Sequence, residues 1–344
     1  MNGIKYPWEN PPDFGDMLEI APGVHWLRLP LPMKLDHVNI YVLDDGDGWT
    51  LVDTGMKTRK VEAMWDALLM GPLKGKPVKR VVATHHHPDH IGFHGWFFDK
   101  YGSEYVSSGV AYYMGRMLTL DVQEGYTDGQ IEFYRRAGMH AELLETRKSE
   151  RPFNFADIVH PVPIGFSRIS EGDTIEMGGR TWDIRIDNGH APHHATFWSR
   201  DDNLVLTGDQ IIPSISSNIG VYPTEPDANP LGEWMYSCSR LQAFATDDLL
   251  ALPGHKLPFT GIPLRLKQLI DNHSGALERL RQALKTPKTA GEVMFAIFKR
   301  DIGDGEYGLG LVEALAHCNY LWHEGEASRV LDGDGVYRFE ITNP

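Results

Sequence analysis

The segment THHHPDHIG, from Thr84 to Gly92, constrains this chain more than any other feature. It places four histidines and an aspartate in six consecutive positions, directly after the apolar run Val81–Ala83. Only 16 histidines occur in the 344 residues, so chance is a poor explanation of this density. An apolar strand that ends in a polar cluster is typical of a ligand site in an α/β protein. The segment therefore indicates a metal site.

Spacing divides the polar side chains of this segment into two sets. Alternate residues of an extended segment point the same way, so His85 and His87 can converge on one ion. Pro88 fixes φ as the chain leaves the strand, and Asp89 and His90 then begin a helix that can serve a second ion. Imidazole and carboxylate ligands without thiolate favour zinc, with iron or manganese as alternatives, bound for catalysis. The competing interpretation is a helix cap beside ordinary surface histidines.

Three later polar residues each follow an apolar, strand-like run. His190 lies in DNGHAPHH, Asp209 in LVLTGDQ and His255 in ALPGHK. Taken singly, each is more typical of a turn or a cap. Because strands that end at one edge of a sheet bring their last residues together, all three can join the first cluster in one site.

The first half of the chain alternates strands and helices. HVNIYVLDDGDGWTLVDTG alternates apolar and polar residues about a Gly-Asp turn and predicts a β-hairpin. A helix over 58–70, a strand at VKRVVATH, a helix at DHIGFHGWFFDKYG closed by Gly102, and a strand at SEYVSS follow. The segment 110–150 is mostly helical and rich in Met and Tyr. We expect it to be an insertion that covers the cleft and shapes the substrate, or that packs on the domain or on a partner subunit.

Strands return from Ile164. A hairpin is predicted at Gly178–Gly179, followed by strands at ATFWSR and NLVLTGD and by helices over 230–245 and 263–284. Together with the β-α-β-α-β succession of the first third, this pattern predicts a mixed α/β chain.

The pattern changes after Thr286. A helix over 290–299, a helix over 309–324 and a hairpin at SRVLDGDGVYRFEI give a winged-helix-like order. We therefore predict a catalytic domain over 1–285 and a small winged-helix-like domain over 286–344.

The motifs resemble, in order and spacing, those of the metallo-β-lactamase-fold hydrolases. HHHPDH matches that family's HxHxDH signature, and GHAPHH, TGDQ and LPGH match its later motifs. The resemblance covers residues 23–284. It implies an α/β (α+β) chain folded as a four-layer αββα sandwich, with a dinuclear metal site in a cleft between two sheets. This chain adds the helical insertion and the C-terminal domain to that plan.

Seven residues take the places of the family's metal ligands. Three are implied for the first ion, three for the second and one as a bridge between them: His85, His87 and His190; Asp89, His90 and His255; and Asp209. Asp53, in VDTG, is expected to orient ligand histidines, or to cap the helix that follows. Asp89 is also the expected catalytic residue, which takes or relays a proton.

Other histidines are not expected to be ligands. His86 and His193 are additional imidazoles, His194 is expected to make a hydrogen bond where a strand starts, and His94 is expected to be a helix residue. Three further residues are candidate substrate contacts: Tyr113, Met117 and His273.

The bridging aspartate narrows the candidate functions. A bridge at Asp209 resembles glyoxalase-II-type thioesterases, lactonases and RNA-processing nucleases, whereas true β-lactamases lack it. We expect a hydroxide that bridges two metal ions to cleave a small thioester, ester or lactone. The alternative is a metal-dependent endoribonuclease or phosphodiesterase that grips nucleic acid with its C-terminal domain. Flavodiiron oxygen reductases of this fold have Glu where this chain has His87, which disfavours redox chemistry.

Charge disfavours nucleic acid as the substrate. The formal net charge is −14, which repels polyanions, and the basic residues of the C-terminal segment are scattered among acidic ones. We therefore expect that segment to form a wall of the cleft or a homodimer surface through an apolar stripe: Leu309, Val312, Leu315, Ala316 and Leu321.

Composition also favours a cytoplasmic enzyme with a small-molecule substrate and no membrane contact. No apolar run approaches the roughly 18–20 residues that a membrane span needs. The N-terminal segment lacks the order of a secretory signal. Two cysteines, Cys238 and Cys318, are too few for a disulfide framework.

Overall fold

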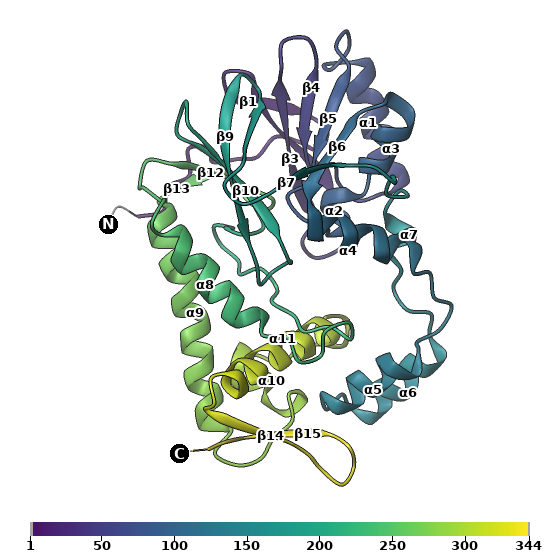
Figure 1. Cartoon of the computed structure of the whole chain (residues 1–344), viewed down its shortest axis with the longest axis vertical. Helices are drawn as coiled ribbons and strands as arrows, with labels where there is room; N and C mark the ends of the chain where they lie inside the picture. Colours follow the sequence, from purple (N-terminus) through teal and green to yellow (C-terminus); the bar gives the residue numbers. More distant parts are fainter. Residues whose placement is uncertain (1–2, 343–344) are drawn as a thin grey trace.

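Two β-sheets pack face to face in the computed structural model, which describes residues 3–342 (Figure 1). The first sheet has seven strands in chain order: β1 (Met17–Ala21), β2 (Val24–Pro30), β3 (His37–Asp44), β4 (Trp49–Val52), β5 (Val78–Val82), β6 (Glu104–Ser108) and β7 (Ser167–Ile169). The second has six, in this spatial order: β13 (Phe259–Thr260), β12 (Leu250–Pro253), β11 (Leu204–Gly208), β10 (His194–Ser199), β9 (Arg180–Asp187) and β8 (Thr174–Met177). Two of the three predicted hairpins lie in these sheets and are confirmed as the antiparallel pairs β3–β4 and β8–β9. The pair β1–β2 was not predicted.

Side chains of the first sheet contribute to two hydrophobic cores, one on each face of the sheet. In β3, Val38, Ile40 and Val42 pack toward the helices outside the sheet. Tyr41 and Leu43, on the opposite face, pack toward the second sheet. Successive side chains of a strand point to opposite faces, and a sheet covered on both sides is apolar on both. The core between the sheets draws on both of them, and its members include Trp26, Val82, Trp182, Phe197 and Leu252.

Helices cover the outer face of each sheet. These helices include α1 (Arg59–Met70), α3 (His94–Tyr101), α8 (Pro230–Leu241) and α9 (Ile262–Ala283). Trp65 of α1 and Phe97 of α3 are fully buried against the first sheet. Trp234 of α8 and Leu266 of α9 are fully buried in the core outside the second sheet. The order helix, sheet, sheet, helix confirms the four-layer αββα sandwich.

The helix predicted at DHIGFHGWFFDKYG is two helices, α2 (Pro88–Ile91) and α3. A Cβ at Gly92, where they separate, would lie 2.3 Å from the carbonyl oxygen of Gly55. The chain therefore bends where the loop after β4 passes close to it. The predicted end at Gly102 is confirmed, with a φ of 69° that glycine adopts readily.

The predicted insertion over 110–150 is helical and reaches across the molecule. Its helices are α4 (Gly109–Leu120), α5 (Asp128–Arg136) and α6 (Ala141–Ser149), and α7 (Phe155–Ile158) follows. In Figure 1, α5 and α6 lie beside the C-terminal elements rather than against either sheet. Phe133 and Met139 are buried in one core with the C-terminal helices, and the Gly291 amide donates to the Ala137 carbonyl at 3.2 Å. We call α5, α6 and their flanking loops the arch.

The C-terminal elements follow the predicted order of helix, helix and hairpin. They are a 3₁₀ turn, η1 (Gly291–Val293), then α10 (Met294–Phe298), α11 (Asp304–His323), β14 (Ala327–Leu331) and β15 (Tyr337–Ile341). The second helix starts at Asp304, not at Leu309, because packing overrides the weak helix propensity of the glycines at 305, 308 and 310. The boundary near Thr286 and the winged-helix interpretation stay predictions.

The apolar stripe of α11 docks on the sandwich at all but one position. Val312, Leu315, Ala316 and Leu321 are buried in the core that α8 and α9 share. Leu309 is 56% exposed, so it does not dock on the sandwich, and its contact with a second subunit stays a prediction.

No helix within residues 3–342 is long and apolar enough to cross a membrane. The longest, α9, has 22 residues and carries charged side chains along its length.

Candidate metal centre

The cluster His85–His90 lies at the C-terminal end of β5, before and within α2. β5 is parallel to both of its neighbours, β4 and β6. Pro88 begins α2, and His87 precedes it with extended backbone and no side-chain cap bond. The ring centroids of His85 and His87 lie 4.5 Å apart. The turn therefore directs both imidazoles into the same space, as their alternate spacing predicted.

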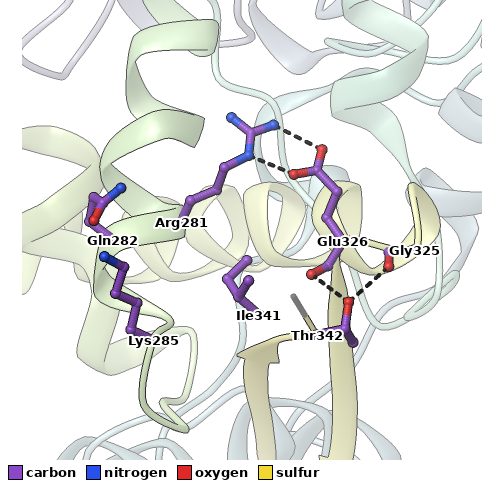
Figure 2. A pocket seen from close by; sticks show the side chains of 7 residues that line it. All are labelled: Arg281, Gln282, Lys285, Gly325, Glu326, Ile341 and Thr342. Atoms are coloured by element: carbon purple, nitrogen blue, oxygen red, sulfur yellow. Dashed lines mark hydrogen bonds and ion pairs between the residues drawn. The ribbon is translucent and has the colours of Figure 1, made fainter. Parts of the chain in front are cut away.

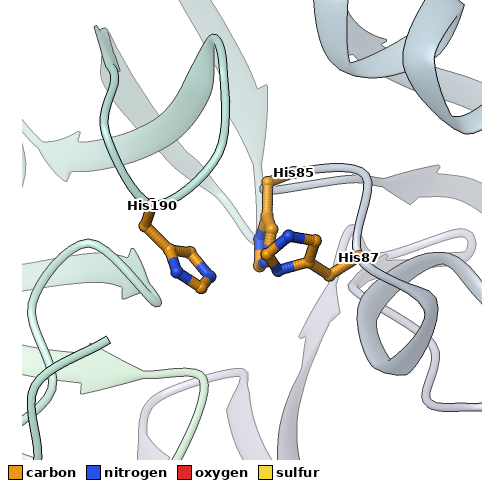
Figure 3. A group of neighbouring side chains, drawn as sticks. All are labelled: His85, His87 and His190. Atoms are coloured by element: carbon orange, nitrogen blue, oxygen red, sulfur yellow. The ribbon is translucent and has the colours of Figure 1, made fainter. Parts of the chain in front are cut away.

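Three strands of the second sheet end at one edge and supply the later candidates. β9, β11 and β12 run in the same direction, since β10 is antiparallel to β9 and β11, and β11 is parallel to β12. His190, Asp209 and His255 follow the C-terminal ends of these strands. Figure 3 shows the ring of His190, from the loop after β9, turned toward those of His85 and His87.

The ligand atoms of all seven candidates form three overlapping groups, and the atoms of each group lie within 4.8 Å of one another. The groups are His85, His87 and His190; His85, His90 and Asp209; and Asp89, His90 and His255. The Oδ2 of Asp209 is central. Three imidazole Nε2 atoms surround it, at 3.5 Å for His90, 3.5 Å for His190 and 3.2 Å for His255.

These separations fit metal coordination. Two atoms that each lie about 2.1 Å from a tetrahedral ion are about 3.4 Å apart. Within the described residues, several buried ligand atoms make no hydrogen bond: the Nε2 atoms of His85, His90 and His190, and the Oδ1 of Asp209. Buried polar atoms normally have a partner, so a group of orphans facing one space indicates a ligand there. The residues present therefore fit bound metal.

Burial and charge prepare these side chains for a cation. Burial, together with neighbouring histidines, lowers the pKa of His85 and His87 well below its usual value, so both rings are neutral at physiological pH. Burial alone would also lower the pKa of His255, but Asp209 and Asp89 outweigh it and raise that pKa to about 10. The two carboxylates hold negative charge that a bound cation would compensate.

Four candidate rings have an outer hydrogen-bond partner at Nδ1. The acceptors are the Asp53 carboxylate for His90 at 2.8 Å, the Asn218 carbonyl for His190 at 2.9 Å, the His37 carbonyl for His255 at 2.7 Å and the Thr84 hydroxyl for His85 at 3.0 Å. Each bond assigns the proton to Nδ1 and leaves Nε2 for a metal ion. Such partners fix the orientation of ligand histidines.

Asp53 orients His90 and Thr84 and caps no helix. Its two carboxylate oxygens accept from the Thr84 amide at 2.9 Å and from the Thr84 hydroxyl at 2.8 Å. Thr58 caps α1 instead, since its side chain accepts from the Val61 amide, so the capping alternative for Asp53 is wrong. The φ of Asp53 is 63°, in the left-handed region that non-glycine residues adopt rarely. Such strain is commonly found at functional sites.

Gly254, in the LPGH motif, leaves room for the central carboxylate. A Cβ at this position would lie 2.2 Å from the Oδ1 of Asp209 and 2.8 Å from the Cε1 of His90. The Gly254 amide donates to the Gly208 carbonyl, and its own carbonyl accepts from the Asn39 amide. The absent side chain lets the loop of His255 approach Asp209 closely.

The remaining histidines of these motifs lie outside the three groups of ligand atoms, as predicted. His194 begins β10, and its Nε2 accepts from the Asp209 amide at 3.0 Å. His94 begins α3, and its Nδ1 lies 2.8 Å from the Thr54 hydroxyl. His86 is buried, and its ring is stacked near Phe155. His193 adopts a positive φ of 52° in the turn before β10.

The three candidate substrate contacts lie in different surroundings. Tyr113 and Met117 are 62% and 44% exposed on α4. His273, on α9, is buried, and its Nδ1 lies 3.2 Å from the Nε2 of His317 on α11. Its own Nε2 lies 3.2 Å from the Ser216 hydroxyl. His273 therefore links two helices and a loop, and substrate contact by any of the three stays a prediction.

The sequence interpretation missed residues that hold the ligands in place. The Asn39 side chain and the Tyr41 hydroxyl both donate to the Pro253 carbonyl, at 2.8 Å and 2.9 Å, so the first sheet holds the end of β12. The Ser217 hydroxyl donates to the Asp209 carbonyl at 2.5 Å. Asn39 and Tyr41 could have been found from the sequence, because they are polar side chains at alternate positions of the apolar strand HVNIYVLD.

A surface pocket lies where the C-terminal hairpin meets the end of α9 (Figure 2). Arg281 donates to both carboxylate oxygens of Glu326, at 2.6 Å and 2.9 Å. The Thr342 hydroxyl donates to the carbonyls of Gly325 and Glu326. None of the seven candidate ligands lines the pocket, and the bonds of Arg281 and Thr342 fasten the hairpin to α9.

Two family models match the chain. One, described as the metallo-beta-lactamase superfamily, matches residues 33–255 and includes all seven candidate ligands. The other, described as the metallo-beta-lactamase-like C-terminal domain, matches residues 277–342, which contain α10, α11 and the terminal hairpin.

Individual proteins show the same likeness. The crystal structure of a beta-lactamase domain protein from Burkholderia ambifaria is 33% identical, with a TM-score of 0.88 over 98% of this chain and 97% of that one. The probable metallo-hydrolase YqjP of Bacillus subtilis is 26% identical over 90% of this chain and 96% of its own length. The atrochrysone carboxyl ACP thioesterase of Aspergillus fumigatus is 23% identical over 74% of this chain and 46% of its own length.

Proposed function

Because the chain belongs to the metallo-β-lactamase superfamily, we propose that it is a dinuclear-metal hydrolase that cleaves a small thioester, ester or lactone. One observation carries the proposal. Seven ligand-type residues from both halves of the chain converge, with their free ligand atoms directed into one space. Metal-assisted hydrolysis needs such a donor set, whereas a binding module would have no need of it.

Each proposed ion has three protein ligands of its own and shares a seventh. His85, His87 and His190 would hold the first ion, Asp89, His90 and His255 would hold the second, and Asp209 would be shared by both. Nitrogen and oxygen donors favour zinc, with iron or manganese as alternatives. The bound metal supplies an activated water and stabilises the negative charge that develops on the substrate.

The proposed proton carrier is Asp89. Its side chain is 17% exposed, against 7% for Asp209, so Asp89 is the carboxylate that water or substrate reaches more easily. A carboxylate that faces the reacting atoms can take a proton and pass it to the leaving group. Asp209, fixed at its amide by His194 and at its carbonyl by Ser217, is held as a rigid bridge instead.

Ion pairing in the C-terminal segment supports a small substrate over RNA. Arg300 pairs with Glu306 at 2.9 Å, Arg329 with Asp227 at 2.8 Å and Arg338 with Asp332 at 2.9 Å. Binding to nucleic acid needs cations that are free to neutralise phosphates. The thioesterase among the similar proteins supports the acyl class.

We expect purified protein to bind two metal ions per chain, as elemental analysis measures. At most one ion per chain, even after metal is added, would contradict the dinuclear assignment. The same preparation should hydrolyse at least one of an acyl-CoA, an acyl-glutathione or a lactone. RNA cleavage without acyl hydrolysis, with salt-sensitive RNA binding, would make the nuclease alternative the better one.

A further inference from the structure

The first turns of α11 lie beside the metal centre. Lys34, in the loop between β2 and β3, pairs with Glu306 at 3.3 Å. On another side the Asn218 side chain donates to Glu313 at 2.7 Å and lies 3.4 Å from the Leu309 carbonyl. Leu309 and Glu313 are four residues apart and share one face of the helix. That face meets the loop after β11, which carries Asp209.

Asn218 joins this helix to a candidate ligand. Its side chain is held by Glu313, and its backbone carbonyl accepts the Nδ1 proton of His190 at 2.9 Å. The same loop is fixed to α11 a second time, since the Val221 amide donates to the Val312 carbonyl at 3.1 Å. Two hydrogen bonds therefore separate the Glu313 carboxyl from the ring of His190.

We propose that Glu313 is a positioning residue of the metal centre, which holds Asn218 and through it the orientation of His190. The inference rests on the proposed function, in which His190 is a ligand. The C-terminal helix then completes the outer layer of a site whose ligands all lie in the sandwich. Asp53 has the corresponding role for His90, but it acts by direct contact.

The expected effect follows from the chemistry of the two bonds. A bond from an amide to a carboxyl group is short and directional here, so it fixes the Asn218 side chain. Loss of an outer partner of a ligand histidine costs about 10- to 100-fold in metal affinity. The apolar contacts of Val312, Leu315 and Ala316 would keep α11 docked without the carboxyl group.

The test uses the full chain and Co²⁺ as a coloured probe. Because Glu313 acts through Asn218 and the carbonyl that His190 contacts is kept, we expect Glu313→Ala to weaken binding of one Co²⁺ ion by up to about tenfold, less than loss of a direct outer partner, and to change its visible spectrum. Thermal unfolding of the metal-free protein should stay within a few degrees of the wild type. Glu313→Gln, which keeps an acceptor oxygen, should restore most of the affinity. Glu324→Ala is the matched control, because Glu324 is exposed at the end of the same helix.

A double-mutant cycle separates positioning from general destabilisation. Asn218→Ala keeps the backbone carbonyl but loses the contact with Glu313, so it should reproduce the effect of Glu313→Ala. The double variant should then be no worse than either single variant. Additive losses, or wild-type Co²⁺ affinity and spectrum in Glu313→Ala, would overturn the inference. Failure of the wild type itself to bind two ions would instead refute the proposed function.

Discussion

The two halves of the metal centre are built differently. The first half supplies four candidate ligands from one run, His85–His90, and supports them with Asp53 and Thr84, which lie just after β4 and β5. The second half supplies His190, Asp209 and His255 singly, each at the end of a different strand. Their supports come from distant elements, including β3 and α11.

This difference shows that the positions of some ligand side chains are determined by a few neighbouring residues, whereas the positions of others depend on the completed fold. A run between a strand and a helix places its side chains by backbone geometry, so a few residues determine their relative positions. Single residues at three strand ends meet only when sheet order and direction are both correct. We therefore expect the geometry of the second half of the site to be altered by substitutions in more parts of the molecule than the geometry of the first half.

The largest expected effect is that of Asp209→Ala, which removes the residue that the two halves share. Its carboxylate lies between Nε2 atoms from both halves, so we expect loss of at least one metal ion per chain. Turnover should fall by more than about 100-fold, beyond the losses typical of outer partners. Elemental analysis, kinetics and circular dichroism measure these outcomes. Near-normal turnover with intact metal would remove Asp209 from the site.

The next prediction compares two substitutions, each of which removes a hydrogen bond that supports one half of the metal centre. Asp53→Asn keeps a residue that tolerates the positive φ but removes the charge that His90 faces, so metal affinity should fall about 10- to 100-fold. Ser217→Ala removes a bond to the backbone of Asp209 rather than to a ligand ring, so its loss should stay under about tenfold.

Metal titration of the two variants side by side decides the comparison. Equal losses would show that the supports of the two halves matter alike. A larger loss in Ser217→Ala would reverse the expected order. Thr246→Ala serves as a control, because Thr246 lies on the surface turn before β12, away from both supports.

The smallest expected effect is that of substitutions in α4, which lies outside both halves of the metal centre. Tyr113→Ala and Met117→Ala alter exposed side chains, so stability should change by about 0.5 kcal/mol or less. Preference among acyl chains of different length should shift if α4 borders the substrate. Thermal unfolding and kcat/KM for a series of acyl substrates test this. A uniform loss across that series would favour a packing role.

Much of the first half of the site was predictable from the sequence, because its geometry is local. The HHHPDH run, the strand before it and the turn at Pro88 all lie within a few residues of one another. The later ligands were indicated by their places after apolar, strand-like runs, and the order of the family's motifs then assigned them to the two ions. Their convergence then followed from strand direction, which the pairing of β9, β10, β11 and β12 confirms.

The supports could not be predicted in the same way. Asn218 contacts Glu313 across 95 residues of sequence, and His255 contacts the His37 carbonyl across 218. Nothing near Asn218 or His255 in the sequence indicates its partner. The strands β1 and β2 were missed because the prolines of the N-terminal segment suggested an irregular lead-in. The glycines before Leu311 likewise hid the start of α11, which long-range packing stabilises.

The arch has a consequence for synthesis on the ribosome. Chains emerge N-terminus first, so Phe133 and Met139 leave the exit tunnel long before the helices that bury them. During that interval the nascent chain presents an apolar surface that nothing yet covers, which is where chaperones bind and where misassembly begins. A pause in translation between the arch and α11 should therefore lower the yield of soluble protein without changing any residue of the metal centre.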